Sequence, residues 1–292
     1  MTQFYRKLSE TFSFLFCLFP WALNRFLGKA LAFIWVDVFK IRQKVVYDNI
    51  DIAFPNTPIE TKRQWMRQSL DVLCRSFFDV IRIPHLTDSW IEKNVNFLGL
   101  ENLEPYKNQG VLLMSLHMAS GDLAAAAFSQ KVKPLSLISK RFTNRFADEF
   151  WFALRTKSKT EFIDAHGKNN AFEILKALKR QRAVVFVIDQ FMGKPYGIET
   201  EFFGRKTGSA YGLALFAQKT KAPVMSLSTF WGPDGKLNVE VGPLIDFSDI
   251  LSEDKDLNNL LMTNRMNQVV ERIIRRNPGQ WMWVHRRWKV FE

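Results

Sequence analysis

Short apolar runs alternate with longer amphipathic segments from residue 111 onward. Short runs bounded by turn residues are typical of buried strands, and apolar positions at helical spacing are typical of amphipathic helices. The pattern therefore predicts an α/β architecture in which helices pack against a sheet. The predicted strands are residues 111–116, 135–138, 183–188, 224–230 and 237–241. The predicted helices are residues 143–156, 170–180, 209–220 and 256–276.

The N-terminal segment is rich in apolar side chains but contains embedded cations. Residues 12–23 are almost wholly apolar, yet Pro20 interrupts them, and the next apolar stretch, 26–36, contains Lys29. These runs are too short and broken for a confident membrane-spanning helix. A cleaved signal peptide is rejected because Arg25 and Lys29 lie where a neutral cleavage region belongs. We expect an interfacial helical anchor, with a pair of core helices or one tilted transmembrane helix as alternatives.

A capping box follows this segment. Thr57-Pro-Ile-Glu60 places a hydroxyl residue three positions before a glutamate and predicts a helix that runs towards Ile83. Because 292 residues suffice for one large core, we divide the chain into a membrane-associating segment, 1–40, and a single domain, 41–292. The apolar positions of the predicted helix that should contact the core are Trp65, Leu70, Leu73, Phe77 and Val80.

Composition narrows the class of partner. A net charge of +12 favours an anionic partner, such as a membrane leaflet, a phosphorylated lipid, an acidic carrier protein or a nucleic acid. The 27 phenylalanines and nine tryptophans favour a membrane interface over a nucleic acid. Cys17 and Cys74 lie far apart in apolar contexts, which indicates reduced thiols and a cytosolic catalytic body.

A histidine follows the predicted strand 111–116 in the sequence His117-Met-Ala-Ser-Gly-Asp122. Ser120 is placed to cap the next helix, and Asp122 then lies in the first turn of that helix. A strand-to-helix turn can fold this carboxylate back onto the imidazole, which fixes the tautomer and stabilises the imidazolium. The pair is therefore a candidate general base. The alternative is a turn histidine beside a capping aspartate.

Several further motifs accompany this box, and together they resemble the lipid A biosynthesis acyltransferase family over residues 42–289. The motifs are Asn49-Ile-Asp-Ile-Ala-Phe-Pro55, Val187-Ile-Asp-Gln190, Phe202-Phe-Gly204, the helix over 212–223 with its Lys-Ala-Pro turn, and Trp283-Val-His-Arg-Arg-Trp-Lys289. The resemblance implies a central mixed sheet flanked by helices, like that of glycerol-3-phosphate acyltransferases, with N-terminal membrane-associating helices. It also implies transfer of a fatty acyl chain from acyl carrier protein or acyl-CoA to a hydroxyl of an anionic, lipid A-precursor-like glycolipid. The expected location is the cytoplasmic face of the inner membrane.

Two departures from the family pattern leave the acid that serves His117 open. The commoner family box closes with tryptophan and glutamate, where this chain has Gly121 and Asp122. The stretch 197–204 is similar to the phosphatidylinositol mannoside acyltransferase branch, in which a glutamate at the position of Glu199 partners the histidine. The catalytic candidates are therefore His117, Asp122 and Glu199.

The remaining site candidates each have a structural alternative. Backbone N–H groups near Ser120 and Gly121 are candidate oxyanion donors, and Ser120 is expected to be a cap rather than a nucleophile because no Gly-x-Ser-x-Gly elbow is present. Direct transfer through a ternary complex is therefore expected. The resemblance further implies substrate binding by Arg155, Asp189 and Gln190, which could instead be solvated or bonded to turn backbone. Arg205 follows Phe-Phe-Gly and is a candidate phosphate contact, although a cation in a turn is usually only solvated.

No zinc signature, Walker loop or dinucleotide fingerprint occurs in the sequence, so we expect no metal, nucleotide or flavin and no nucleic-acid partner. Two other functions stay open. A lipid hydrolase or thioesterase could use the same histidine and acid on water. A noncatalytic basic protein could bind membrane or nucleic acid through charge alone.

Overall fold

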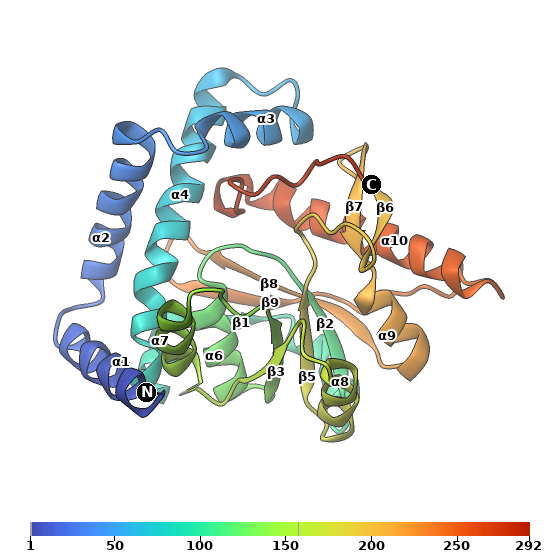
Figure 1. Cartoon of the computed structure of the whole chain (residues 1–292), viewed down its shortest axis with the longest axis horizontal. Helices are drawn as coiled ribbons and strands as arrows, with labels where there is room; N and C mark the ends of the chain where they lie inside the picture. The colour runs from blue at the N-terminus through green and yellow to red at the C-terminus, as the bar shows by residue number, and fades with distance from the viewer. Residues whose placement is uncertain (1, 157) are drawn as a thin grey trace.

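The computed structural model describes residues 2–156 and 158–292 (Figure 1). The N-terminal helices are α1 (Thr2–Cys17), α2 (Ala22–Phe33), a short π-helix (Ile34–Val38), α3 (Gln43–Ala53) and α4 (Ile59–Ile81). The later helices are α5 (Asp88–Asn94), α6 (Gly121–Lys131), α7 (Arg145–Arg155), α8 (Asn170–Lys179), α9 (Gly212–Thr220) and α10 (Lys255–Arg276). The strands are β1 (Val95–Leu98), β2 (Val111–Ser115), β3 (Leu135–Ser139), β4 (Glu161–Asp164), β5 (Ala183–Val187), β6 (Gly197–Phe202), β7 (Arg205–Ala210), β8 (Val224–Trp231) and β9 (Leu237–Val241).

Seven of these strands form one sheet in the order β1-β9-β8-β2-β5-β3-β4. Neighbouring strands are parallel except for β8 and β9, which a tight turn joins as an antiparallel pair. The sheet is therefore mixed, as expected. Strands β6 and β7 form a separate antiparallel hairpin.

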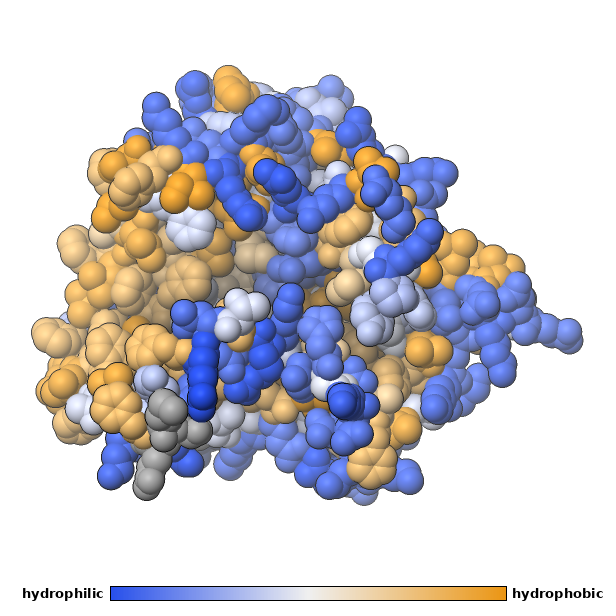
Figure 2. Space-filling model, viewed as in Figure 1, coloured by the Kyte–Doolittle hydropathy of each residue, from blue (hydrophilic) through white to orange (hydrophobic). Residues whose placement is uncertain are grey.

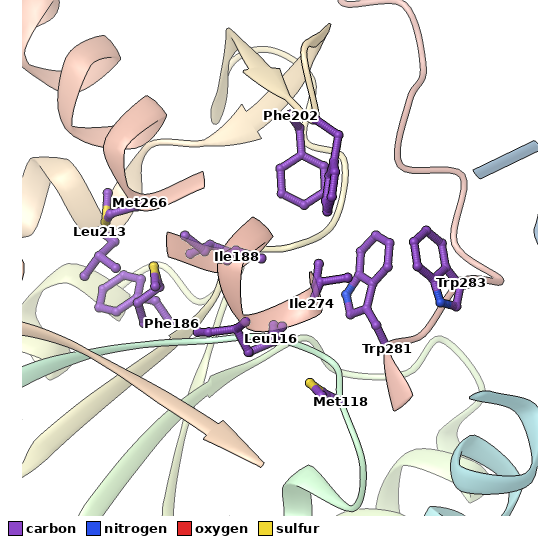
Figure 3. Packing of buried hydrophobic residues seen from close by; sticks show 14 of the residues in the cluster. Leu116, Met118, Phe186, Ile188, Phe202, Leu213, Met266, Ile274, Trp281 and Trp283 are labelled. Carbon is purple, nitrogen blue, oxygen red and sulfur yellow. The ribbon is translucent and has the colours of Figure 1, made fainter. Parts of the chain in front are cut away.

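Helices cover both faces of the sheet, which explains why its central strands are continuous apolar runs. Alternate side chains of β2 enter different layers: Leu112 faces the layer of α8, α9 and α10, and Leu113 faces the layer of α5 and α6. In the first of these layers, Phe186, Leu213 and Met266 come from β5, α9 and α10 and lie close together (Figure 3). The sheet and its two helical layers form the core.

At one end of the molecule, α2 packs against α4 and α1 packs mainly against α7 (Figure 1). Asn24, Gly28 and Ala32 are buried and lie four residues apart, so they form one face of α2. A Cβ atom on Gly28 would lie 2.8 Å from the Cα atom of Arg75, so this glycine permits the close approach of the two helices. Within the described part of the chain, no helix combines the length and the apolar character needed to cross a membrane.

The five predicted strands and the helical segments between them are confirmed, whereas β1, β4 and the β6–β7 hairpin were not predicted. The helix expected from residue 209 begins at Gly212, because Ser209 and Ala210 complete β7. The capping-box prediction is wrong: Pro58 occupies the N-cap position of α4 and no side chain caps this helix. Pro58 has an extended ψ of 145°, so the helix begins only at Ile59 and the Thr57 hydroxyl lies outside it. Both cysteines are free thiols, as expected.

Candidate functional site

The site is built where two adjacent parallel strands end. Ser115 of β2 pairs with Val187 of β5, so residues two positions beyond these partners, His117 and Asp189, meet at the same edge of the sheet. The His117 Nδ1 atom lies 2.8 Å from Asp189 Oδ1, and the backbone N–H of His117 donates to Asp189 Oδ2 at 2.9 Å. The indole Nε1–H of Trp281 donates to the same Oδ2 atom at 2.7 Å. Three hydrogen bonds thus hold one carboxylate, which is only 2 % exposed.

The electrostatics of this pair suit proton transfer. Burial lowers the pKa of His117, but the charge and hydrogen bond of Asp189, with a smaller contribution from the charge of Asp122, outweigh burial and raise the pKa above its usual value. Burial raises the pKa of Asp189, and the interactions with His117 and Trp281 more than reverse this effect, so the carboxylate stays ionised. An ionised acceptor at Nδ1 keeps the proton on that nitrogen and leaves the Nε2 lone pair free.

The Nε2 atom of His117 faces the open side of the site. The His117 side chain is 41 % exposed. The side-chain amide of Gln190 lies beside it, with its Nε2 atom 3.4 Å from His117 Nε2. The ring is therefore held on one side by Asp189 and accessible to a substrate hydroxyl on the other.

The segment His117–Asp122, which we call the histidine turn, is tied to its surroundings at successive positions. Ala119 adopts a positive φ of 49°, which a side chain tolerates only when neighbours hold the backbone in place. The sequence predicted that the Ser120 hydroxyl caps α6, and this prediction is wrong. The hydroxyl instead donates a hydrogen bond to Asp79 Oδ2 at 2.6 Å. Further backbone ties are Met282 N–H to His117 O, Thr229 Oγ1 to Met118 O, and Ala119 N–H to Gln280 O.

Gly121 begins α6 and faces open space. A Cβ atom built on Gly121 would meet no heavy atom within 4 Å. The N–H groups of the first turn of a helix have no acceptor within the helix itself. The first N–H groups of α6 therefore lack acceptors within the helix, and the space beside the Gly121 Cα atom is open.

Neither of the two carboxylates expected to orient His117 bonds to it. Asp122 accepts hydrogen bonds from Arg155, whose Nε and Nη2 atoms lie 2.8 and 2.7 Å from Asp122 Oδ1. Glu199 pairs with Lys206 at 3.2 Å across the β6–β7 hairpin, and the Glu199 side chain is 46 % exposed. Asp189 was expected as a substrate-binding residue, with a structural role as the alternative, and it is the carboxylate that contacts the imidazole.

Comparison with known proteins identifies the family of this chain. A sequence model described as bacterial lipid A biosynthesis acyltransferase matches residues 4–290. The chain belongs to this family. It is 23% identical over 274 residues to the lipid A biosynthesis palmitoleoyltransferase of Escherichia coli (strain K12), which covers 93% of this chain and 86% of that protein. It is 24% identical over 283 residues to the lauroyltransferase of the same organism, with coverage of 93% and 87%.

A lipid A biosynthesis acyltransferase of Haemophilus influenzae (strain ATCC 51907 / DSM 11121 / KW20 / Rd) is 22% identical over 279 residues and covers 93% of this chain and 86% of its own length. The crystal structure of the 1-acyl-sn-glycerophosphate acyltransferase PlsC from Thermotoga maritima aligns with a TM-score of 0.41 and 15% identity, over 90% of this chain and 99% of that one. Membership of the family makes this chain an acyltransferase.

The C-terminal tail of this acyltransferase supplies site residues that sequence reasoning missed. Trp281 donates a hydrogen bond to Asp189, and its ring packs beside those of Trp283 and Phe202 (Figure 3). His285 Nε2 accepts a hydrogen bond from the N–H of Phe191, and burial lowers the pKa of His285 to about 4, so the ring stays neutral. Tryptophans are frequent in this tail, but the sequence carries no signal that pairs Trp281 with Asp189.

Two arginines near the hairpin lie in different environments. Arg287, in the tail, is fully buried and donates to Gly208 O and Ser209 Oγ, and burial lowers its pKa to about 10. Arg205 is exposed at the start of β7. Among residues 2–156 and 158–292, no group of three or more histidine, cysteine, aspartate or glutamate side chains is arranged to hold a metal ion.

Proposed function

We propose that this acyltransferase moves a fatty acyl group from an acyl carrier protein or acyl-CoA thioester directly to a hydroxyl of an anionic, lipid A-precursor-like glycolipid. The observation that carries the proposal is the His117–Asp189 pair, with Nδ1 bonded at 2.8 Å and Nε2 open to the site. His117 is the proposed general base. Asp189 takes the orienting role for which the sequence offered Asp122 or Glu199.

The chemical steps use the residues that the fold brings together. The acceptor oxygen attacks the thioester carbon while His117 Nε2 takes its proton, and Asp189 stabilises the imidazolium that forms. N–H groups at the start of α6, near Ser120 and Gly121, bind the tetrahedral oxyanion. The C–S bond then breaks, the thiolate leaves and the imidazolium returns the proton to sulfur. An ester on the acceptor and a free thiol on the carrier result.

Gln190 and Arg205 are proposed to contact the substrates, and Arg155 is proposed to hold the site together. Gln190 lies beside His117 Nε2 and can bind the acceptor hydroxyl or the thioester. Arg155 is engaged by Asp122 and Ser139, so we assign it to holding the histidine turn against α7. Arg205 is exposed and suits a phosphate of the acceptor.

The same proposal places the protein on the cytoplasmic face of the inner membrane through its N-terminal helices. Apolar side chains gather over the part of the surface where Figure 1 places α1 and α2 (Figure 2). Arg25 and Lys29 lie among them, suited to anionic head groups. The large apolar side chains that are exposed within residues 4–41 are Phe4, Leu8, Phe12, Phe14, Leu15, Leu18, Phe19, Phe26, Phe33, Ile34, Val38, Phe39 and Ile41.

Product analysis tests the reaction. Purified full-length protein is incubated with an acyl thioester, with and without a lipid A-precursor acceptor, and the lipids are analysed by mass spectrometry. We expect one acyl increment on the acceptor and little free fatty acid. Free fatty acid released equally in both reactions would instead support a hydrolase or thioesterase, and no thioester consumption would support the noncatalytic alternative.

Flotation with anionic vesicles tests the membrane surface. Replacing Phe26 and Phe33 with serine removes two exposed apolar side chains of α2 and should weaken flotation, because less apolar area enters the interface. Phe172→Ser is the matched control, since Phe172 is 66% exposed on α8, away from α1 and α2 in Figure 1. Equal flotation of all variants would show that binding depends on another surface.

A further inference from the structure

A cluster of buried polar side chains joins α2, α4 and the histidine turn. Asp79, near the end of α4, lies at its centre and is fully buried. Its Oδ1 atom accepts a hydrogen bond from Asn24 Nδ2 at 2.7 Å, and its Oδ2 atom accepts one from Ser120 Oγ at 2.6 Å. A buried carboxylate is destabilising unless it accepts hydrogen bonds. Moving either donor away would therefore cost free energy, which restrains the positions of Asn24 and Ser120.

Two arginines offset the charge of this carboxylate. Arg75 Nε lies 3.4 Å from Asp79 Oδ2. Arg82 donates from Nε to Asn24 Oδ1 at 2.8 Å and from its other nitrogens to carbonyl groups between α1 and α2. Burial raises the pKa of Asp79, and the arginines with Asn24 and Ser120 oppose that rise. The cluster therefore links the N-terminal helices to the histidine turn through charge-assisted contacts.

Ser120 is the point at which the cluster reaches the site. A serine immediately before a helix usually caps that helix with its own hydroxyl. Here the hydroxyl makes no cap bond and is donated to Asp79. The orientation of Ser120, and of the peptide group that joins it to Gly121, is thus set by α4.

We propose that Asp79 is a positioning residue for acyl transfer, which through the Ser120 hydroxyl holds the N–H groups at the start of α6 where the oxyanion forms. The inference rests on the proposed function and adds a residue 38 positions before the histidine, from another helix. Hydrogen bonds to a transition state depend steeply on geometry, and a displacement of about 1 Å can cost roughly 100-fold in rate. The same carboxylate holds Asn24, so the α2 helix and the histidine turn share one anchor.

The test is a double-mutant cycle in the full-length enzyme with Ser120→Ala, Asp79→Asn and the double variant. Ser120→Ala removes the donated hydrogen bond and keeps the backbone N–H groups. Asp79→Asn leaves an amide that can serve only one of the two donors. The matched control is Ser129→Ala on the same helix, because Ser129 is also buried and its hydroxyl accepts from Leu135 N–H at the far end of α6.

We expect kcat to fall at least about tenfold in both single variants, with KM for the thioester within about twofold of wild type and the acid limb of the pH profile unmoved. The double variant should be no slower than the slower single variant, because both changes break one linkage. Ser129→Ala should keep wild-type kcat. Each variant is also checked by thermal unfolding, since a purely structural role would lower the melting temperature without this pattern in kcat.

Wild-type kcat in folded Ser120→Ala, or multiplied losses in the double variant, would overturn the proposal. If Asp79→Asn does not fold, Ser120→Ala decides alone. His117→Ala separates this inference from the function on which it rests. An active His117→Ala enzyme contradicts the proposed function, whereas an inactive one beside a fully active Ser120→Ala enzyme contradicts only the role of Asp79.

Discussion

The carboxyl ends of the central strands and the β6–β7 hairpin each carry a carboxylate that could serve His117, but in opposite environments. Asp189 is 2 % exposed and accepts three hydrogen bonds at the sheet edge. Glu199 is half-exposed and pairs only with Lys206 on its own hairpin. Charge interactions are weak in water and much stronger where water is excluded. Asp189, which is buried and bonded to the ring, therefore raises the pKa of the imidazole, whereas Glu199 is half-exposed and bonds within its own hairpin.

The largest expected effect comes from removing the group on which this comparison rests. His117→Ala should lower acyl transfer roughly 100- to 10,000-fold, the usual effect of deleting a general base. The measurement is the initial rate of acyl transfer together with thermal unfolding. His166→Ala is the control, because His166 is exposed in a turn. A folded His117→Ala enzyme with wild-type turnover would contradict the mechanism.

Asp189→Asn should have the next largest effect. Losing the carboxylate that fixes the tautomer and orientation of the base is expected to lower kcat/KM by at least about tenfold. The base must be neutral, and Asp189 raises the pKa of His117, so wild-type kcat/KM should fall as the pH drops through a value above the ordinary 6.5. Without the carboxylate charge, this acid limb should move to lower pH. An unmoved limb would show that Asp189 does not act on the imidazole.

Asp122→Asn changes the carboxylate that pairs with Arg155. We expect it to lower the free energy of unfolding more than it lowers the rate of acyl transfer. Arg155 is 6% exposed, so removing the charge of its partner leaves a buried cation poorly compensated, at about 1–3 kcal/mol of unfolding free energy. Glu240→Gln breaks the more exposed pair with Arg276 and should cost no more than about 1 kcal/mol. Denaturant unfolding compares the two variants, and equal losses would contradict the role assigned to Arg155.

The smallest effect is expected for Glu199→Gln. An exposed ion pair contributes little, so turnover should stay within about twofold of wild type. The rate is measured beside that of Asp189→Asn under the same conditions. A larger loss of turnover for Glu199→Gln than for Asp189→Asn would indicate that Glu199, and not Asp189, is the carboxylate that serves His117.

The elements that the sequence predicted well are those in which local pattern and burial agree. Strands β2 and β5 are apolar at every position except Ser115, because both faces of the sheet are covered, and such runs are visible without a structure. The β6–β7 hairpin was missed because its strands contain few apolar residues: Ile198 and Phe202 in β6, and Ala210 in β7. The sequence signal for this hairpin was Gly204. In the structure, Phe203 and Gly204 form a two-residue turn in which both have positive φ, a conformation that glycine favours.

The sequence by itself determined the family, the α/β class and His117 as the candidate base, because motifs and hydrophobic period are properties of neighbouring residues along the chain. Only the tertiary structure decided that Asp189 contacts His117 and that Ser120 bonds to Asp79. Both contacts join separate elements, and they depend on strand register and helix packing. Spacing along the chain constrains neither, so a hydrogen-bond partner 72 positions away could be identified only once β2 and β5 were paired.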